Sequence, residues 1–122
     1  MSHGIQEPAA FVYRLVPRST WDEFKSRGRI EASAIDRKDG FFHLSPREDV
    51  CETATLYFPG QDMMAIEWPT SVLGEGLRYE PVPARGDRLF PHLYGTLPRP
   101  GDATAEVLLT WTGERFIWPL PP

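Results

Sequence analysis

The chain has 122 residues, of which 41% are hydrophobic and 25% charged, and its formal net charge is −4. This length and composition indicate one globular domain and exclude extended disorder and a coiled coil. No apolar run approaches the roughly 20 residues of a membrane span, and the acidic balance argues against a general nucleic-acid binder, which carries a basic face. The first residues lack the basic and apolar segments of a secretory signal, so we expect a cytoplasmic protein.

The N-terminal part of the chain predicts a strand followed by a helix. Residues 11–16 are rich in strand-forming side chains and predict the first strand. Thr20 and Glu23 have the spacing of a capping box, in which each side chain binds the other residue's backbone N–H. They predict a helix that ends at Gly28, a residue suited to the left-handed position after a helix.

A second strand and a second helix follow. Residues 41–44 predict the strand. Ser45 and Glu48 then have the spacing of a second capping box, with Pro46 at the first helical position, which is typical of a helix start. Hydrophobic residues recur with helical spacing until residues 59–60, Pro-Gly, end the pattern.

The second half of the chain predicts strands only. Pro91 lies within one of them, and because proline has no N–H to donate, it predicts an edge strand or an irregular strand. The last two segments are separated by residues 112–114 and predict a closing antiparallel hairpin. The predicted strands cover residues 63–68, 77–80, 88–94, 103–111 and 115–118.

Two early helices and a run of later strands are typical of the α+β class. We therefore expect a single domain over residues 11–118, built on a twisted antiparallel or mixed sheet, with both helices in the N-terminal half and the hairpin closing the sheet. Residues 1–10 are expected to be a frayed N-terminus and residues 119–122 a short tail.

The segment from His43 to Arg47 is the first candidate site. Alternation along a strand places His43 and Ser45 on one side, and the predicted helix start brings free N–H groups and a positive dipole end to the same point. With the Arg47 guanidinium nearby, these groups predict a pocket for an anion. The alternative is structural: a hydrogen-bonded core histidine followed by a helix cap.

Phe90, His92 and Tyr94 form the second candidate site, because in an extended chain their side chains share one face. Two aromatic rings with an imidazole between them suit stacking on a planar ligand such as a purine or nicotinamide. The alternative is core packing, which is common for aromatic residues in strands. We expect the imidazoles of His43 and His92 to open onto one shared hollow rimmed by guanidinium groups.

Glu80 is the third candidate. In a pocket its carboxylate would act as a general base or stabilise a developing cation, and the alternative is an ion pair with Arg78 two residues earlier. Other chemistries are not favoured by the sequence. No ligand spacing predicts a metal site, and the single cysteine, Cys51, lies inside the second predicted helix without an activating base.

These segments resemble the bacterial family catalogued as domain of unknown function 952, and the similarity extends in order over residues 11–118. That family is in turn grouped, on distant similarity, with the ADP-ribosyltransferase-like fold. The block ending in His43-Leu44-Ser45 is similar to one in the tRNA 2′-phosphotransferases of that group. The resemblance rests on Tyr13-Arg14, Trp21, residues 40–45, residues 77–80 and residues 90–95.

The resemblance implies a split β-sheet around a cleft that binds NAD in active relatives. It assigns Arg14 to a first-strand position where the family more often has His. It assigns Ser45, with His43, to the middle-strand position, and Glu80 to the later carboxylate. In this scheme Arg14 and Arg47 would hold a pyrophosphate by charge-assisted hydrogen bonds.

Phe90 and Tyr94 would then flank nicotinamide or adenine, and His43 or Glu80 would stabilise an oxocarbenium-like transition state or activate the acceptor. His92 is the third catalytic candidate. The sequence leaves several functions open. The first is an enzyme, an ADP-ribosyl or 2′-phosphate transferase with NAD as a candidate substrate. The second is a binding module without catalysis, for an anionic metabolite such as ADP-ribose or for a protein partner. The third is a structural protein whose polar side chains only satisfy one another.

Overall fold

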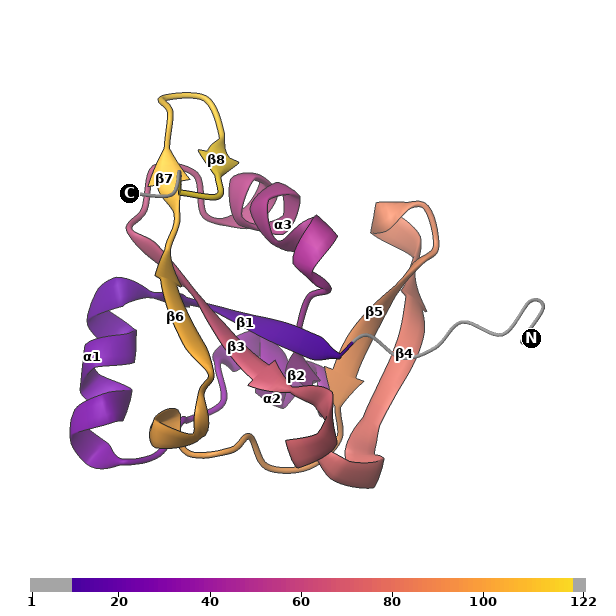
Figure 1. Ribbon diagram of the computed structural model, residues 1–122. Coiled ribbons are helices and arrows are strands. Elements are labelled where there is room, and N and C mark those ends of the chain that lie inside the picture. Colours follow the sequence, from indigo (N-terminus) through magenta and orange to yellow (C-terminus); the bar gives the residue numbers. More distant parts are fainter. Residues whose placement is uncertain (1–9, 120–122) are drawn as a thin grey trace.

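The strands of the computed structural model, which describes residues 10–119, form three antiparallel sheets (Figure 1). One sheet has the strand order β1-β3-β6, the second has the order β2-β5-β4, and the third is the hairpin β7-β8. With few helices, this is the predicted α+β class. The strands are β1 (Phe11–Pro17), β2 (Phe42–His43), β3 (Met63–Pro69), β4 (Leu77–Val82), β5 (Arg88–Leu93), β6 (Ala105–Leu108), β7 (Thr110–Trp111) and β8 (Phe116–Ile117).

The α-helices all lie in the first half of the described chain. They are α1 (Arg18–Arg27), α2 (Ala34–Asp39) and α3 (Val50–Tyr57), and a 3₁₀ turn (Arg47–Asp49) precedes α3. In Figure 1, α1 lies beside β6 at the left, and α3 lies next to the hairpin β7-β8 at the top. The helices α1 and α3 thus cover different parts of the sheet β1-β3-β6.

The sheet β1-β3-β6 has a core cluster on each face. Successive side chains of a strand point to opposite sides, so β1 and β3 each contribute to both clusters. One face contributes to a core cluster that contains Val12, Val16, Met64, Ile66 and Trp68 with Trp21 and Phe24 of α1. The other face contributes to a cluster that contains Tyr13, Met63 and Ala65 with Val50 and Ala54 of α3 and Phe116 of the hairpin. Burial on both sides fixes β1 and the polar residues that it carries.

The first helix begins earlier than predicted. Pro17 is its N-cap and α1 starts at Arg18, so Thr20 already lies in the first turn and no side-chain cap forms. The predicted capping box of Thr20 and Glu23 is therefore wrong, because β1 continues directly into the helix. Gly28 ends the helix as predicted, with a left-handed φ of 74°.

The second predicted capping box is also wrong, because the backbone of Ser45 is used by β1. The N–H of Ser45 donates to the carbonyl of Tyr13 at 2.8 Å, and the N–H of Tyr13 donates to the carbonyl of Ser45 at 2.9 Å. Pro46 instead takes the N-cap position of the 3₁₀ turn, and α3 begins only at Val50. The predicted helix N-terminus beside His43 and Ser45 is consequently absent from this position.

The helix α2 was not predicted. The hydroxyl of Ser33 accepts the backbone N–H of Asp36 at 3.2 Å, and the carboxylate of Asp36 accepts the N–H of Ser33 at 2.8 Å, which completes a capping box. Gly40 ends the helix with a left-handed φ of 82°. A helix of six residues is too short to show a hydrophobic stripe, so only these end signals mark it.

Pro91 lies in β5, which is the central strand of its sheet. The predicted edge position is therefore wrong. The carbonyl of Pro91 accepts the N–H of Leu44 at 3.1 Å, and the nitrogen and carbonyl of one strand residue point to the same side. The missing N–H therefore faces the end of β2, a strand of two residues, and β4 loses no ladder hydrogen bond. This geometry is why a central strand tolerates the proline.

The predicted C-terminal hairpin is confirmed, with Trp111 opposite Phe116, but it forms a sheet of its own instead of closing the others. The preceding strand, β6, pairs with β3. The predicted N-terminal fraying and C-terminal tail fall almost wholly outside the described residues. No helix within residues 10–119 is long and apolar enough to cross a membrane.

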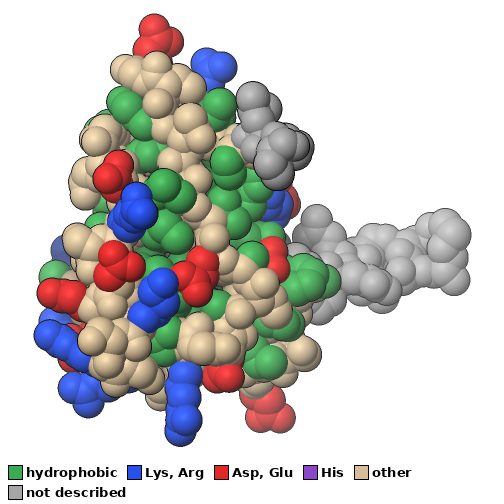
Figure 2. Space-filling view, turned by 60° about the vertical axis from the view of Figure 1, so that its left-hand side comes forward, with side chains coloured by type: hydrophobic (Ala, Val, Ile, Leu, Met, Phe, Trp, Pro, Cys, Tyr) green, Lys and Arg blue, Asp and Glu red, His purple; other side chains and the backbone are tan. Residues whose placement is uncertain are grey.

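The surface over α1 and β6 carries charges of both signs (Figure 2). Lys25 of α1 pairs with Glu106 of β6 at 3.1 Å and lies 4.0 Å from Asp22. The indole N–H of Trp21 donates to the same Glu106 carboxylate at 2.7 Å. Lys25 on this face is therefore matched by neighbouring carboxylates.

Candidate functional site

A cavity of about 860 Å³ lies where β1, α1, the segment of α2, β2, α3 and β5 meet. Its volume is within the range of small-molecule sites, which run from about 300 to 1,000 Å³. Its hydrophobic lining includes Val16, Phe24, Leu44, Phe58 and Phe90. Its polar lining includes Arg14, His43, Ser45, Arg85 and His92. Apolar walls with a few convergent polar groups are typical of a ligand site.

The two imidazoles in the cavity face each other across neighbouring strands. His43 of β2 is paired directly with His92 of β5 in the antiparallel register. Their ring centroids are 5.7 Å apart, and both residues line the cavity. The predicted shared hollow of His43 and His92 is therefore confirmed.

His43 is held by two carboxylates of α2. Its Nδ1 lies 2.7 Å from Asp36 Oδ1, and its Nε2 lies 2.9 Å from Asp39 Oδ2. The hydrogen bond to Asp36 raises the pKa of His43 above the usual 6.5, burial opposes the rise, and Asp39 adds to it. Only the imidazolium form has an N–H for each carboxylate, so the environment favours a protonated ring.

Arg14 of β1 and Asp36 form a buried ion pair behind His43. The two terminal nitrogens of Arg14 lie 2.5 and 3.1 Å from the two carboxylate oxygens, and one of them also donates to the carbonyl of His43 at 2.9 Å. Burial alone would raise the pKa of Asp36, but the hydrogen bonds from His43 and Arg14 outweigh it and hold that pKa far below its usual range. Asp36 thus joins β1, α2 and β2.

His92 is backed by a different carboxylate, that of Glu80 on β4. Its Nδ1 lies 2.9 Å from Glu80 Oε1, which also accepts the hydroxyl of Tyr94 at 2.7 Å. The hydrogen bonds from Tyr94 and His92 lower the pKa of Glu80. Because an ionised carboxylate only accepts, a neutral His92 carries its proton on Nδ1 and leaves Nε2 with a free lone pair.

The faces and edges of the His92 ring have different surroundings. Phe41 stacks on the ring, with centroids 4.0 Å apart and planes at 25°. Among the described residues, Nε2 of His92 has no hydrogen-bond partner, and the residue lines the cavity. The ring is therefore fixed by Glu80 and Phe41, with one nitrogen available to a ligand.

Arg85 forms the far wall of the cavity and is also paired. Its Nε and one terminal nitrogen lie 3.2 and 2.9 Å from Glu52 Oε1, and its other terminal nitrogen donates to the hydroxyl of Thr53 at 2.7 Å. The guanidinium lies over the Phe90 ring, 4.7 Å from its centroid. Arg88 binds the same Glu52 oxygen at 2.6 Å.

Residues 15–104 match the family described as Protein of unknown function (DUF952). The chain belongs to the DUF952 family. Among solved structures, the X-ray structure of protein CC0527 from Caulobacter crescentus is 37% identical, with a TM-score of 0.76, over 88% of this chain and 93% of that one. The solution NMR structure of CC0527 is 36% identical, with a TM-score of 0.71, over 88% and 91%. No curated protein matches this chain.

The cavity of this DUF952 protein brings together most of the predicted site residues. Glu80 and Tyr94 are connected to the cavity only through His92. The Glu80 carboxylate binds the His92 ring and also accepts the hydroxyl of Tyr94. Arg47 does not join the group, because its guanidinium lies over the ring of Trp118, 3.4 Å from the centroid. The predicted convergence of Arg47 with the histidines is therefore wrong. The residues that line the cavity as predicted are Arg14, His43, Ser45, Phe90 and His92.

Sequence reasoning missed four residues that shape the DUF952 site. Asp36 and Asp39 were missed because the helix α2, which carries them, was not predicted. The sequence signals for this helix are Ser33 at its N-cap and Gly40 at its C-cap. Phe41 and Arg85 carried no signal, because their positions depend on contacts with distant strands. Three of the missed residues, Asp36, Asp39 and Arg85, carry charge at the site.

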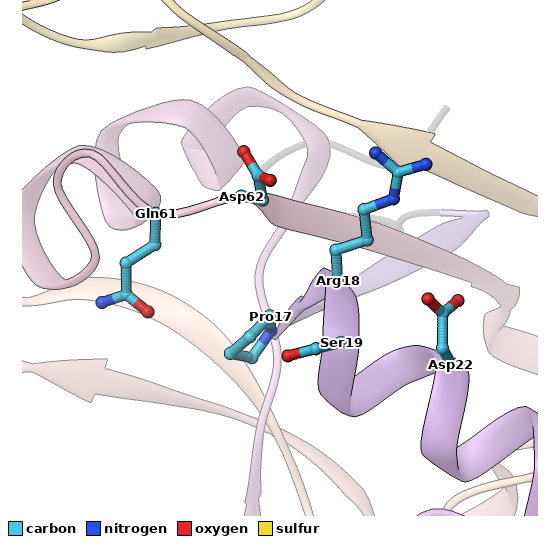
Figure 3. A pocket seen from close by; sticks show the side chains of 6 residues that line it. All are labelled: Pro17, Arg18, Ser19, Asp22, Gln61 and Asp62. Atoms are coloured by element: carbon cyan, nitrogen blue, oxygen red, sulfur yellow. The ribbon is translucent and has the colours of Figure 1, made fainter.

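A second, smaller hollow of about 390 Å³ lies at the start of α1. In Figure 3, Arg18 and Asp22 extend from α1, whereas Gln61 and Asp62 extend from the segment before β3. These four side chains do not converge on one point. Its lining contains no histidine or cysteine. Within residues 10–119, no cluster of three His, Cys, Asp or Glu side chains is arranged to hold a metal ion.

Replacing His43 with Gln is expected to make the stability of this DUF952 protein less dependent on pH. Because the folded-state pKa of His43 is raised, its bonds to Asp36 and Asp39 contribute fully below about pH 6.5 and are lost as the pH rises through the folded-state pKa. Urea unfolding at several pH values above about 5, where the carboxylates are ionised, measures the difference between wild type and variant. A difference that stays constant over this range would contradict the assignment.

Proposed function

We propose that the cavity binds a nucleotide-type ligand of the NAD or ADP-ribose class and that His92 acts on it as a base beside the positive charge of His43. The observation that carries the proposal is the cross-strand pair itself. Two imidazoles 5.7 Å apart line one cavity, and each is held by different carboxylates. An imidazole with a free ring nitrogen, beside a second imidazole held by other carboxylates in the same space, is suited to general base catalysis.

The two rings have complementary roles. His92, oriented by Glu80, has Nε2 free to take the proton of a hydroxyl or a water that attacks the ligand. His43 provides a positive charge beside it, because Asp36 and Asp39 favour its protonated form. If an N-glycosidic bond of NAD is cleaved, nicotinamide leaves as a neutral molecule, the acceptor oxygen bonds to the ribose carbon, and the acceptor's proton is transferred to His92.

The resemblance to the ADP-ribosyltransferase-like fold supports the choice of ligand. Arg14, Ser45 and His43, the residues that it assigns to the first two motif positions, line the same cavity. Glu80, assigned to the later carboxylate, reaches the cavity through His92. A cytoplasmic location accords with a ligand of this class and is part of the proposal.

One observation favours the alternative of a binding module without turnover. Both ring nitrogens of His43 are already bound, to Asp36 and to Asp39. A ring with no free N–H contributes charge and orientation but cannot transfer a proton to a ligand without first leaving a carboxylate. Binding without release of product would therefore indicate the second function.

The test combines calorimetric titration with NAD and ADP-ribose and an assay for free nicotinamide. We expect a ligand of this class to bind, and His92→Asn to lower any turnover by about a hundredfold or more, as for loss of a general base. Arg47→Gln is the matched control, because that residue lies outside the cavity and its variant should bind as the wild type does. Failure of both ligands to bind would overturn the proposal.

A further inference from the structure

We infer that the cavity recognises an uncharged planar ring of its ligand, such as a nucleobase, and does not bind a phosphate or diphosphate. The inference rests on the proposed function and specifies which part of a nucleotide the site selects. It follows from how the two guanidinium groups that line the cavity, those of Arg14 and Arg85, are paired.

Arg14 is not available to an anion. Its terminal nitrogens hold both oxygens of Asp36, a carboxylate whose side chain is only 2% exposed. A phosphate that drew Arg14 away would leave this carboxylate buried with His43 as its remaining charged partner. An under-compensated buried charge is strongly unfavourable, so the ion pair is retained.

Arg85 is occupied as well, although less firmly. Two of its nitrogens bind Glu52 and the third binds Thr53, so each nitrogen has a partner. Glu52 is half exposed and is also held by Arg88. Glu52 therefore supplies to Arg85 the negative charge that a ligand anion would otherwise provide.

The rim of the cavity adds negative charge. Glu23 and Glu31 line it together with Asp39. Glu23 has no ion pair within residues 10–119, and Glu31 is paired with Arg27 and Arg29 only at 3.5 Å. Asp39 is paired with His43, and the lining arginines are paired as well. Glu23 and Glu31 are therefore the carboxylates that repel an entering phosphate.

The remaining features fit an uncharged ring. Phe24, Phe58 and Phe90 line the cavity and offer aromatic surfaces against which a planar ring packs. Nε2 of His92 lines the same cavity and stays free for the attacking hydroxyl of the proposed function, because the ring needs no hydrogen bond from it. A flat, uncharged heterocycle fits these aromatic walls.

Adenosine, AMP and ADP test the inference, because they differ only in phosphate. We expect adenosine to bind at least as tightly as AMP and ADP, with little change between low ionic strength and about 0.15 M salt. An affinity that rises about tenfold or more from adenosine to ADP and falls with salt would overturn the inference while leaving the proposed function in place. Failure of all three, and of NAD and ADP-ribose, would overturn both.

A variant makes the test sharper. Glu52→Gln removes the internal anion beside Arg85, and we expect it to raise the affinity for ADP several-fold without changing that for adenosine. Glu114→Gln, an exposed substitution in the hairpin, is the control for the loss of one negative charge. An unchanged affinity for ADP in Glu52→Gln, with adenosine still bound, would contradict the role given to Glu52.

Discussion

Replacing Asp36 with Asn is expected to destabilise the protein by about 3–5 kcal/mol, the range for removing one member of a buried ion pair. Asn keeps the size of the side chain but leaves the Arg14 guanidinium, which is 10% exposed, without a counter-charge. It also weakens the bond to His43, so β1, α2 and β2 lose the group that joins them. Urea unfolding followed by tryptophan fluorescence measures the change.

Asp39→Asn is the matched control for this effect. Asp39 lies on the same helix and binds the same imidazole, at 2.9 Å, but its side chain is 35% exposed and it holds no arginine. A partly exposed pair of this kind contributes less than about 1 kcal/mol. Equal losses of stability in the two variants would show that burial of the Arg14 pair is not what holds the site together.

Gly76→Ala is expected to cost about 2–3 kcal/mol, the upper part of the range for overpacking. A Cβ at this position would lie 2.3 Å from the carbonyl oxygen of Tyr94 and 3.1 Å from its carbonyl carbon. These are backbone atoms, and the N–H of Tyr94 donates to the carbonyl of Gly76 at 2.8 Å, so neither chain moves away freely. The strain falls where the paired strands β4 and β5 end, two residues from His92.

Gly95→Ala serves as the control for Gly76, because a Cβ there meets no atom within 4 Å. Thermal unfolding of both variants, recorded under the same conditions, gives the comparison. We expect the transition of the Gly95 variant to coincide with that of the wild type. A Gly76 variant of wild-type stability would mean that the β4 and β5 backbones separate readily.

The strands were largely predictable because each is specified locally. Residues 63–68 are almost continuously apolar, and in the fold they supply side chains to both core clusters, which is the pattern of a strand buried on both faces. Helix starts were less predictable. Pro17 joins β1 directly to α1, and a capping pattern read at Thr20 has no meaning once the helix has already begun.

The candidate site was predictable only in part, because its residues meet through long-range pairing. The strand face of His43 and His92 followed from alternation, and the register that sets them opposite each other comes from pairing of β2 with β5. The partner of Arg14 is Asp36, and no spacing in the sequence links the two. The charge of the site, which decides what it binds, therefore needed the structure.

Nitrogen-15 spectra of the histidine rings in the intact chain test most directly where the two imidazoles of the cavity carry their protons. His43→Gln and His92→Asn assign the signals. We expect His43 to keep protons on both nitrogens to a pH above 6.5, a neutral His92 to carry its proton on Nδ1, and a nuclear Overhauser contact between the rings. A His43 ring that is neutral below pH 6.5, or a His92 ring with its proton on Nε2, would contradict this arrangement.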